Sequence, residues 1–224
     1  MAGEPESLHT KESLKKRIIR HDYDRLLMLS DGVFAIAITL LALDLTLPVK
    51  WDGSVEGLAS ATGRPLIGYL FGFVLVGAFW FMHRRTFAQM EQVDGSVTIL
   101  NLVLLGIVGL TPFVARMIAE AGPTRAMPFY LVEVAGVLGS VALIRGWGAI
   151  RPVLLHAQVD RARWQRELLH LAAATLVLGA VGLWAIIEHQ KLTGNLMIAL
   201  VAILAGSRGL LRRFGDQMSS TRRP

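Results

Sequence analysis

Cysteine is absent from this 224-residue chain, and charged side chains are scarce. The absence of cysteine excludes disulfides, thiol catalysis and thiolate metal sites. Charged residues make up 18% of the chain, whereas soluble domains usually carry about 25%. Hydrophobic residues make up 53%, and the mean hydropathy is +0.50. Several apolar runs reach the roughly 20 residues that cross a bilayer, so the sequence predicts an integral membrane protein and not a large soluble core.

Six apolar runs predict six transmembrane helices, which makes the expected fold an all-α membrane protein. We expect the spans at Leu26–Leu47, Leu66–Met82, Val97–Ile118, Pro128–Ile144, Leu168–Ile187 and Asn195–Leu211. The second and sixth runs are short, which leaves room for a tilted or partly re-entrant segment at either place. The first run follows a polar segment and is too long for the apolar core of a cleavable signal peptide, so we expect it to remain in the mature protein.

Lys and Arg residues are distributed unevenly between the expected loops. With both termini placed in the cytoplasm, 18 of the 23 Lys and Arg residues fall on the cytoplasmic side, as the positive-inside rule requires. An odd number of spans would remove this asymmetry. The net charge of +6 is therefore a topology signal, and it favours contact with anionic lipids at the cytoplasmic face. We expect no nucleic-acid partner, because aromatic residues do not alternate with the basic clusters outside the spans.

The layout divides the chain into three segments. Residues 1–25 form a basic cytoplasmic N-terminal arm, residues 26–211 the six-helix transmembrane domain, and residues 212–224 a basic cytoplasmic tail. The arm is either a basic helix lying at the membrane surface or a solvated flexible segment. No internal duplication is visible, and the connections are too short to hold a soluble domain.

Two acidic residues make the first expected helix the least lipid-like of the six. Asp31 and Asp44 lie within it, and an ionised Asp at the bilayer centre costs about 2.5–3.5 kcal/mol on insertion scales. Such side chains normally face protein or water, so this helix is expected inside an assembly. Another unexplained charge, Glu133, lies in the fourth span, where it is either a functional acid or the partner of Arg145 or of another helix.

Helix geometry separates an apolar stripe from the acid at the start of the first helix. Ile36, Leu40 and Leu43 follow the i, i+4, i+7 pattern, and Thr39 lies at the edge of their stripe. Asp31 points about 140° away from Ile36, since each residue turns the helix by about 100°. Taken alone, the stripe is typical of ordinary packing or lipid contact. If Asp31 is buried, its partner has to come from another helix or another subunit.

The first helix carries the run Arg25-x-x-x-Leu29-Ser30-Asp31, continuing through Ile36 to Leu40. This run resembles the signature of the TMEM175 potassium-channel family, whose hallmark is Arg-x-x-x-Phe-Ser-Asp at the start of the first helix. The layout is similar over the whole chain, although the match outside the first helix is looser. The similar features are the six spans, Trp80 and His83 at the end of the second helix, Asn101 and Pro112-Phe113.

The resemblance implies a homotetramer in which the first helices of four six-helix subunits surround a central pore. It implies a passive potassium-conducting cation channel in a bacterial inner membrane, with K⁺ as the permeant ion, no cofactor and no bound metal. A single helix per subunit cannot enclose a water-filled path, and fourfold closure satisfies the symmetry expected of a ring.

The resemblance also assigns roles to individual residues. Ile36 would form the narrowest apolar ring, with Leu40 and Leu43 further out, and Thr39 would supply a hydroxyl layer for ion discrimination. A second group would hold the pore helices against their neighbours: Arg25, Ser30, Asp31, Trp80 and His83. Asp44 is a candidate acid at the outer mouth, or else a helix-end acid that faces solvent. We expect Arg25 to be tied to Asp22, Asp24 or a neighbouring subunit's Asp31, because a bare arginine ring would repel cations.

Two departures from the family pattern bear on selectivity and packing. Leu29 replaces the hallmark Phe, which loosens an aromatic contact at the helix start, and Ala35 stands where some members carry a hydroxyl. The chain also lacks a Thr-Val-Gly-Tyr-Gly filter, so selectivity cannot come from a cage of backbone carbonyls.

Two other function classes compete with the channel. A secondary transporter could couple protons through Asp31, Glu133 or His83, although transporters usually contain internal repeats and helices interrupted at midplane. An enzyme is not expected, because the chain lacks a Ser-His-Asp constellation, a His-Glu-x-x-His motif and a phosphate loop.

Overall fold

The computed structural model describes residues 4–47 and 51–189, with side chains described from Arg17 onward, except for Ile18. Within these ranges the elements in chain order are α1 (Glu4–Leu41), the 3₁₀ turn η1 (Ala42–Asp44), α2 (Val55–Phe87), α3 (Gly95–Val108), α4 (Thr111–Ala121), α5 (Pro123–Ile150), η2 (Pro152–Leu154) and α6 (Arg161–Ile187). The described residues contain no β-strand, and a single antiparallel bridge joins Met90 to Leu155. The expected all-α fold is confirmed.

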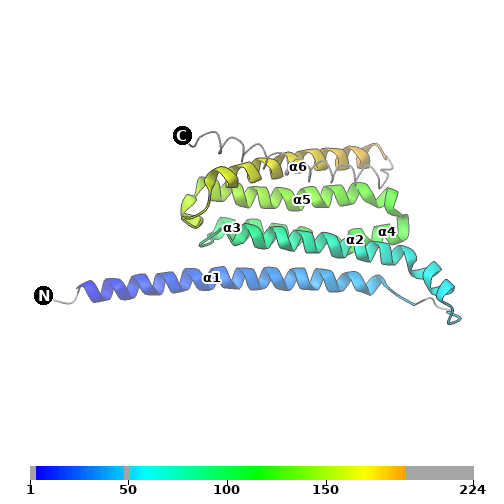
Figure 1. The fold of residues 1–224 in the computed structure, drawn as a ribbon, viewed down its shortest axis with the longest axis horizontal. Coiled ribbons are helices and arrows are strands. Elements are labelled where there is room, and N and C mark those ends of the chain that lie inside the picture. The colour runs from blue at the N-terminus through cyan, green and yellow to red at the C-terminus, as the bar shows by residue number, and fades with distance from the viewer. Residues whose placement is uncertain (1–3, 48–50, 190–224) are drawn as a thin grey trace, which may run out of the picture.

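The helices lie side by side along one common direction (Figure 1). Among the described helices, α1 forms one flank and packs against α2, α3 and α4, while α6 forms the opposite flank and packs extensively against α5. The N-terminal part of α1 projects beyond the other helices at the end where α2 and α5 finish. α5 is the most central helix, since 61% of its apolar window is buried, against 22–39% in the other spans.

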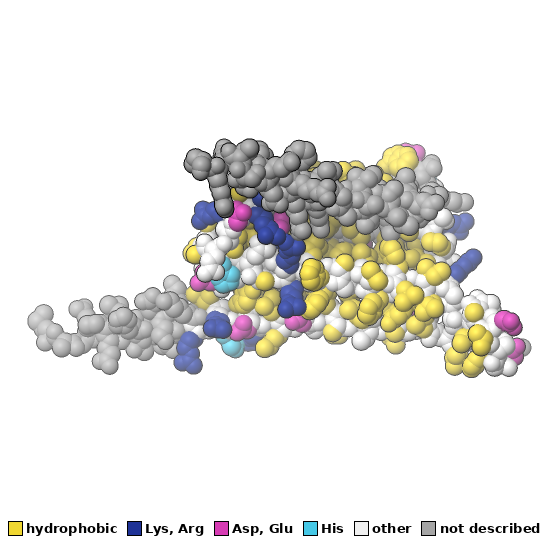
Figure 2. Space-filling model, in the orientation of Figure 1, with side chains coloured by type: hydrophobic (Ala, Val, Ile, Leu, Met, Phe, Trp, Pro, Cys, Tyr) yellow, Lys and Arg dark blue, Asp and Glu magenta, His cyan; other side chains and the backbone are white. Residues whose placement is uncertain are grey.

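Five segments of the described chain are long and apolar enough to cross a membrane: Ile19–Asp44, Val55–Phe87, Gly95–Ala121, Pro123–Ile150 and Arg161–Ile187. Hydrophobic side chains cover the middle of the visible face, and charged side chains gather toward its two ends (Figure 2), as in a protein whose middle lies in lipid. The sixth expected span, at residues 195–211, lies outside the described residues, as does the expected tail at 212–224.

Several expected helix boundaries are wrong. The first helix starts at Glu4 and runs without interruption through the expected boundary at residue 25, and its α-helical part ends at Leu41 instead of Leu47. The second helix is not a short segment: it covers 33 residues, with Ser54 capping its N-terminus through a bond from the Gly57 backbone N–H. Its first turns are polar or small, which is why hydropathy alone missed them.

The third expected span is two helices. α3 ends at Val108 and α4 begins at Thr111. Pro112 occupies the first turn of α4, where a residue without an N–H is tolerated, whereas in a continuous helix the same proline would leave a carbonyl unpaired. Gly122, with φ of 83°, then joins α4 to α5 in the left-handed region that favours glycine.

Two glycines let α2 approach the other helices closely. A Cβ added to Gly68 would lie 2.8 Å from the Ala115 carbonyl oxygen of α4, and one added to Gly72 would lie 2.8 Å from a Leu41 methyl group of α1. The spacing of these two glycines is the small-residue pattern that permits close packing of membrane helices. α1 and α4 therefore pack directly against the backbone of α2.

Candidate pore-lining helix and its anchoring network

One face of α1 is buried in the bundle. Its members follow helical spacing and are each at most 6% exposed: Leu26, Ser30, Phe34, Ala37 and Leu41. Four of the five are apolar, so packing against α2, α3 and α4 fixes how α1 is rotated about its own axis. That rotation decides which residues are left on the other face.

The other face of α1 is apolar and exposed. Ile36 is 59% exposed and Leu40 42%, and both lie on the stripe expected from the sequence. Leu43, the third expected member, is 68% exposed but lies in η1, beyond the end of the α-helix. Thr39 and Arg25 are exposed as well. The Thr39 hydroxyl donates to the Ile36 carbonyl at 2.9 Å, so only its oxygen lone pairs remain for a ligand outside the helix.

A buried hydrogen-bonded chain joins α1 to α3 and α2. The Asn101 amide Nδ2 donates to Ser30 Oγ at 2.9 Å, and the Ser30 hydroxyl donates to the Leu26 carbonyl at 2.8 Å. Asn101 Oδ1 lies 2.8 Å from His83 Nε2. Because an amide oxygen can only accept, this arrangement assigns the proton to Nε2 of the imidazole.

The same chain is closed off from water. Ser30, Asn101 and His83 are each at most 2% exposed. The His83 ring lies between Phe34 and Phe87, with ring centroids 5.4 and 4.4 Å away. Each of these buried polar atoms therefore relies on its hydrogen-bond partner in this Ser30–Asn101–His83 network, since water cannot replace a lost partner. Ser30, Asn101 and His83 are far apart in the sequence, and the structure brings them together.

A second contact holds the acid of the motif. The Trp80 indole Nε1 of α2 donates to Asp31 Oδ1 at 2.8 Å, and the guanidinium of Arg84 lies 5.5 Å from the Trp80 ring centroid. The partner of Asp31 is thus another helix of the same chain. Arg25 lies on the exposed side, and no described acidic side chain pairs with it, so the expected tie to Asp22 or Asp24 is absent within the described residues.

At the opposite end of α1, Asp44 is held by α4. Arg116 donates to Asp44 Oδ1 from Nε at 2.9 Å and from Nη2 at 2.5 Å. This pair partly neutralises the Asp44 carboxylate, and it ties the 3₁₀ turn after α1 to α4. The sequence pattern does not predict Arg116 as the partner of Asp44, because 72 residues separate the two.

Glu133 does not pair with Arg145, one of the partners considered for it. The Thr111 hydroxyl at the start of α4 donates to Glu133 Oε1, whereas Arg145 pairs with Glu167 at 2.8 Å. Glu133 is 5% exposed, and its Oε2 has no partner within the described part of the chain.

Asp94 caps the N-terminus of α3, outside the membrane-spanning segments. Its Oδ1 accepts from the Val97 backbone N–H at 2.9 Å, and its Oδ2 accepts from Trp147 Nε1 at 2.9 Å and lies 3.5 Å from Arg151 Nη1. Burial of Asp94 favours its neutral form, but the hydrogen bonds from Trp147 and Val97 and the charge of Arg151 outweigh burial and lower its pKa. The carboxylate therefore joins the N-terminal end of α3 to the C-terminal end of α5.

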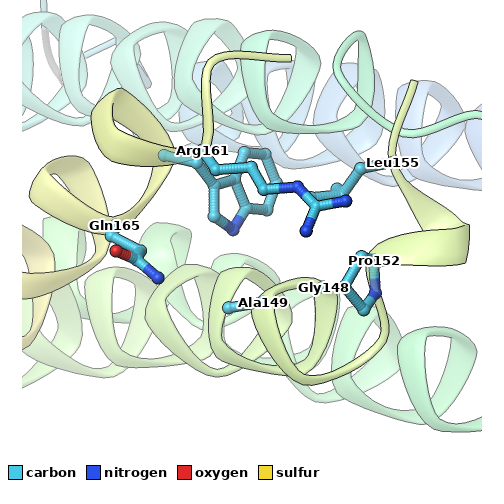
Figure 3. A pocket seen from close by; sticks show the side chains of 7 residues that line it. Gly148, Ala149, Pro152, Leu155, Arg161 and Gln165 are labelled. Atoms are coloured by element: carbon cyan, nitrogen blue, oxygen red, sulfur yellow. The ribbon is translucent and has the colours of Figure 1, made fainter. Parts of the chain in front are cut away.

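Two hollows lie beside α5. An apolar groove of about 840 Å³ runs over α5 between α3 and α6, with Leu143, Trp147 and Leu168 among its lining residues. A small pocket of about 70 Å³ lies where α5 ends and α6 begins, and the Arg161 side chain extends across it toward Leu155 (Figure 3). Its volume suits about two water molecules. No group of three or more potential metal ligands occurs among the described residues.

Within the described residues, these features define a multi-pass, all-helical membrane protein whose motif-bearing helix α1 has one face buried in the bundle and an opposite face that is exposed. Residues 25–112 match the family model described as "Endosomal/lysosomal potassium channel TMEM175". A Streptomyces collinus protein named as a potassium channel is 39% identical over 123 residues, covering 51% of this chain and 59% of the relative. A Chryseobacterium protein, also named as a potassium channel, is 36% identical over 101 residues, covering 43% of this chain and 49% of the relative.

A solved structure agrees on the fold. A crystal structure of a variant of the potassium channel MtTMEM175, in complex with a nanobody–MBP fusion protein, matches 84% of this chain and 93% of the solved chain, with a TM-score of 0.58 at 20% identity. Residues 25–112 are thus similar to the TMEM175 family, which the first-helix motif predicted, and the expected multi-pass membrane location is confirmed. The matches span about half the length of the curated relatives.

Proposed function

We propose that the protein is a potassium-conducting cation channel. In this proposal four copies assemble around a central pore, each with six transmembrane helices and cytoplasmic termini, and α1 of each copy lines the path. Ile36 forms the narrowest ring, with Leu40 and Leu43 further out. The names of the two bacterial relatives support the potassium-conducting activity.

The observation that carries the proposal is the difference between the two faces of α1. The buried face is fixed by apolar packing and by the Ser30–Asn101–His83 chain, while the exposed face presents Ile36, Leu40 and Leu43 with no covering element among the described residues. Because the buried face fixes the rotation of α1 about its own axis, the same three side chains would face the central pore axis in every copy. A pore-lining helix needs this rigidity, because a rotation of one residue would replace Ile36 by Ala35 or Ala37.

A ring of Ile36 side chains would gate by wetting and dewetting. In a narrow ring the apolar side chains exclude water, and a slightly wider ring admits a hydrated cation. Thr39, one turn further out, would offer its hydroxyl lone pairs to the ion as it passes. Since Asp44 is paired with Arg116, it would act mainly by holding the outer end of α1 and less by attracting cations.

The cysteine-free sequence permits a sharp test of the pore-lining assignment. Ile36→Cys places four thiols at the proposed ring, and soft thiolate ligands bind soft metal ions tightly. We expect Cd²⁺ to block the potassium current of this variant and a chelator to restore it. Ile99→Cys is the matched control, because Ile99 is 64% exposed on α3. Equal block of both variants, or of neither, would remove Ile36 from the pore.

One observation keeps a coupled transporter as the second candidate. Glu133 is buried in α5, and its Oε2 lacks a partner among the described residues, as a proton-carrying acid would require. Saturable uptake that follows the proton gradient and carries no ohmic current, and that Glu133→Gln abolishes, would favour the transporter and contradict the channel.

A further inference from the structure

Three arginines converge on one glutamate where α2, α5 and α6 meet. The arginine cluster consists of Arg85 of α2, Arg145 of α5, and Arg163 and Glu167 of α6. Arg145 Nη2 lies 2.8 Å from Glu167 Oε2, whereas Arg85 Nη2 and Arg163 Nε lie 3.4 and 3.3 Å from Glu167 Oε1. Among the described residues, three positive charges thus share a single carboxylate, which leaves an excess of two positive charges in the cluster.

Arg145 is the buried centre of the cluster. It is 2% exposed, its guanidinium carbon lies 4.3 Å from the Trp164 ring centroid, and the Trp164 indole N–H donates to its backbone carbonyl at 2.9 Å. Its Nε and Nη1 are buried without a hydrogen-bond partner within the described part of the chain. Buried cationic donors are normally satisfied, so the cluster is short of acceptor oxygens as well as of negative charge.

The other two arginines are reachable from outside. The side chains of Arg85 and Arg163 are 41% and 55% exposed. Both lie beyond the roughly 2.7–2.9 Å of a strong charge-assisted bond to a carboxylate, and both approach the same oxygen. The guanidinium groups of Arg85 and Arg163 are therefore held only weakly by Glu167. An oxyanion bound between them would replace two long contacts by short hydrogen bonds, with little loss of existing interaction energy.

The level of the cluster in the bundle indicates which oxyanion it meets. Arg85 lies two residues before the end of α2, Arg145 five residues before the end of α5, and Glu167 six residues after the start of α6. These offsets place the cluster within about 3–9 Å of the helix ends, at the depth of lipid head groups. The end concerned is the one from which α1 projects (Figure 1), and it carries the excess of basic residues that marks the cytoplasmic leaflet.

We propose that the arginine cluster binds a phosphate group at the cytoplasmic membrane surface, between Arg85 and Arg163, with Arg145 behind it. A guanidinium fork matches phosphate oxygens in bidentate geometry, as lysine does not. The phosphate group is supplied either by the phosphodiester of an anionic phospholipid or by free phosphate. This inference concerns binding only, and it holds whether or not the protein conducts potassium.

The test compares two double variants that remove the same charge from the same end. Arg85→Gln/Arg163→Gln removes the two exposed guanidinium groups of the cluster. Arg161→Gln/Arg166→Gln is the control, because it removes two exposed arginines of α6 that belong to no ion pair within the described residues. Native mass spectrometry of the purified protein in detergent measures binding of phosphatidylglycerol, with phosphatidylcholine as the neutral-headgroup control. Because the cluster variant loses the charged hydrogen bonds of two guanidinium groups, we expect it to bind phosphatidylglycerol at least about tenfold more weakly, and the control variant to bind it as the unmodified protein does.

Further arms identify the source of the phosphate and the chemistry. If inorganic phosphate at millimolar concentration displaces the lipid, a free anion suffices; if it does not, the lipid is the ligand. Arg85→Lys/Arg163→Lys keeps the charge and loses the fork, so we expect intermediate affinity. Wild-type affinity in the folded glutamine variant, or an equal loss in both double variants, would overturn the proposal, and thermal melts of each variant without lipid establish that it is folded.

Discussion

Asn101 is the residue on which the anchoring of α1 depends most directly. It is fully buried and bonds to both Ser30 of α1 and His83 of α2. Asn101→Leu keeps the volume and removes both bonds. Ser30 keeps its own bond to the Leu26 carbonyl, but the His83 N–H is left buried with no acceptor from this side chain.

The magnitude follows from these contacts. Hydrogen bonds between membrane helices contribute about 0.6 kcal/mol on average and up to about 1.7 kcal/mol, and an unsatisfied buried donor costs about 1–3 kcal/mol. We therefore expect Asn101→Leu to destabilise the protein by about 2–4 kcal/mol. His83→Phe, which fits between Phe34 and Phe87, leaves Asn101 Oδ1 unpaired and costs a similar amount. Removing both partners together is nearly neutral for this pair.

A double-mutant cycle measures the coupling. The free energy of unfolding in detergent is determined for the unmodified protein, for each single variant and for His83→Phe/Asn101→Leu. We expect the double variant to be more stable than the sum of the single effects predicts, by about 2–3 kcal/mol, because neither member of the pair is then left buried and unpaired. Leu102→Ala, at a neighbouring position that is 49% exposed, is the control and should change stability little. Additive single effects would refute the claim that the buried chain acts as a unit.

Three further predictions concern other parts of the structure. Ile36→Asn should wet the proposed ring and raise the potassium conductance several-fold, whereas Ile99→Asn should not; an unchanged single-channel current in the first variant would remove Ile36 from the gate. Gly68→Ala should cost about 1–3 kcal/mol, because the new methyl group meets the Ala115 backbone at 2.8 Å, while Gly77→Ala, with nothing within 4 Å, should be neutral or stabilising in thermal melts. Because the pKa of Asp94 is lowered in the folded state, its stabilising effect is complete above its unfolded pKa of about 4 and is lost as the pH falls through the folded value. Asp94→Asn, which keeps a capping side chain, should therefore be less stable than the unmodified protein at pH 7, and its free energy of unfolding should fall less steeply as the pH is lowered. A fall as steep as that of the unmodified protein would contradict this role of Asp94.

The apolar runs predicted where membrane helices lie, but not where they begin and end. α2 extends through residues 55–65 because Ser54 caps a turn of small and polar residues, and hydropathy carries no signal for such a turn. The run of the third expected span is one candidate membrane span in the structure as well, but the break before α4 was not predicted, although Pro112 is a visible cause for it. Likewise, the polar residues before Leu26 continue the same helix.

The motif residues were found from the sequence, whereas their partners were not. Ser30, Asp31, Trp80 and His83 stand out as polar or aromatic groups in or near apolar runs, and Asn101 does so in α3. Which of them touch depends on how three helices are rotated against each other, and no spacing within one helix records that rotation. For the same reason the pairs Asp44–Arg116 and Arg145–Glu167 were missed.

The most direct measurement of the central claim is the reversal potential of the purified protein in planar bilayers, under a potassium gradient and then with sodium opposite. The account predicts an ohmic current that reverses near the potassium equilibrium potential, carried by a passive cation pathway. No current above that of the empty bilayer, from protein shown to be folded, would contradict the channel and make Asp31 and Glu133 the next residues to change.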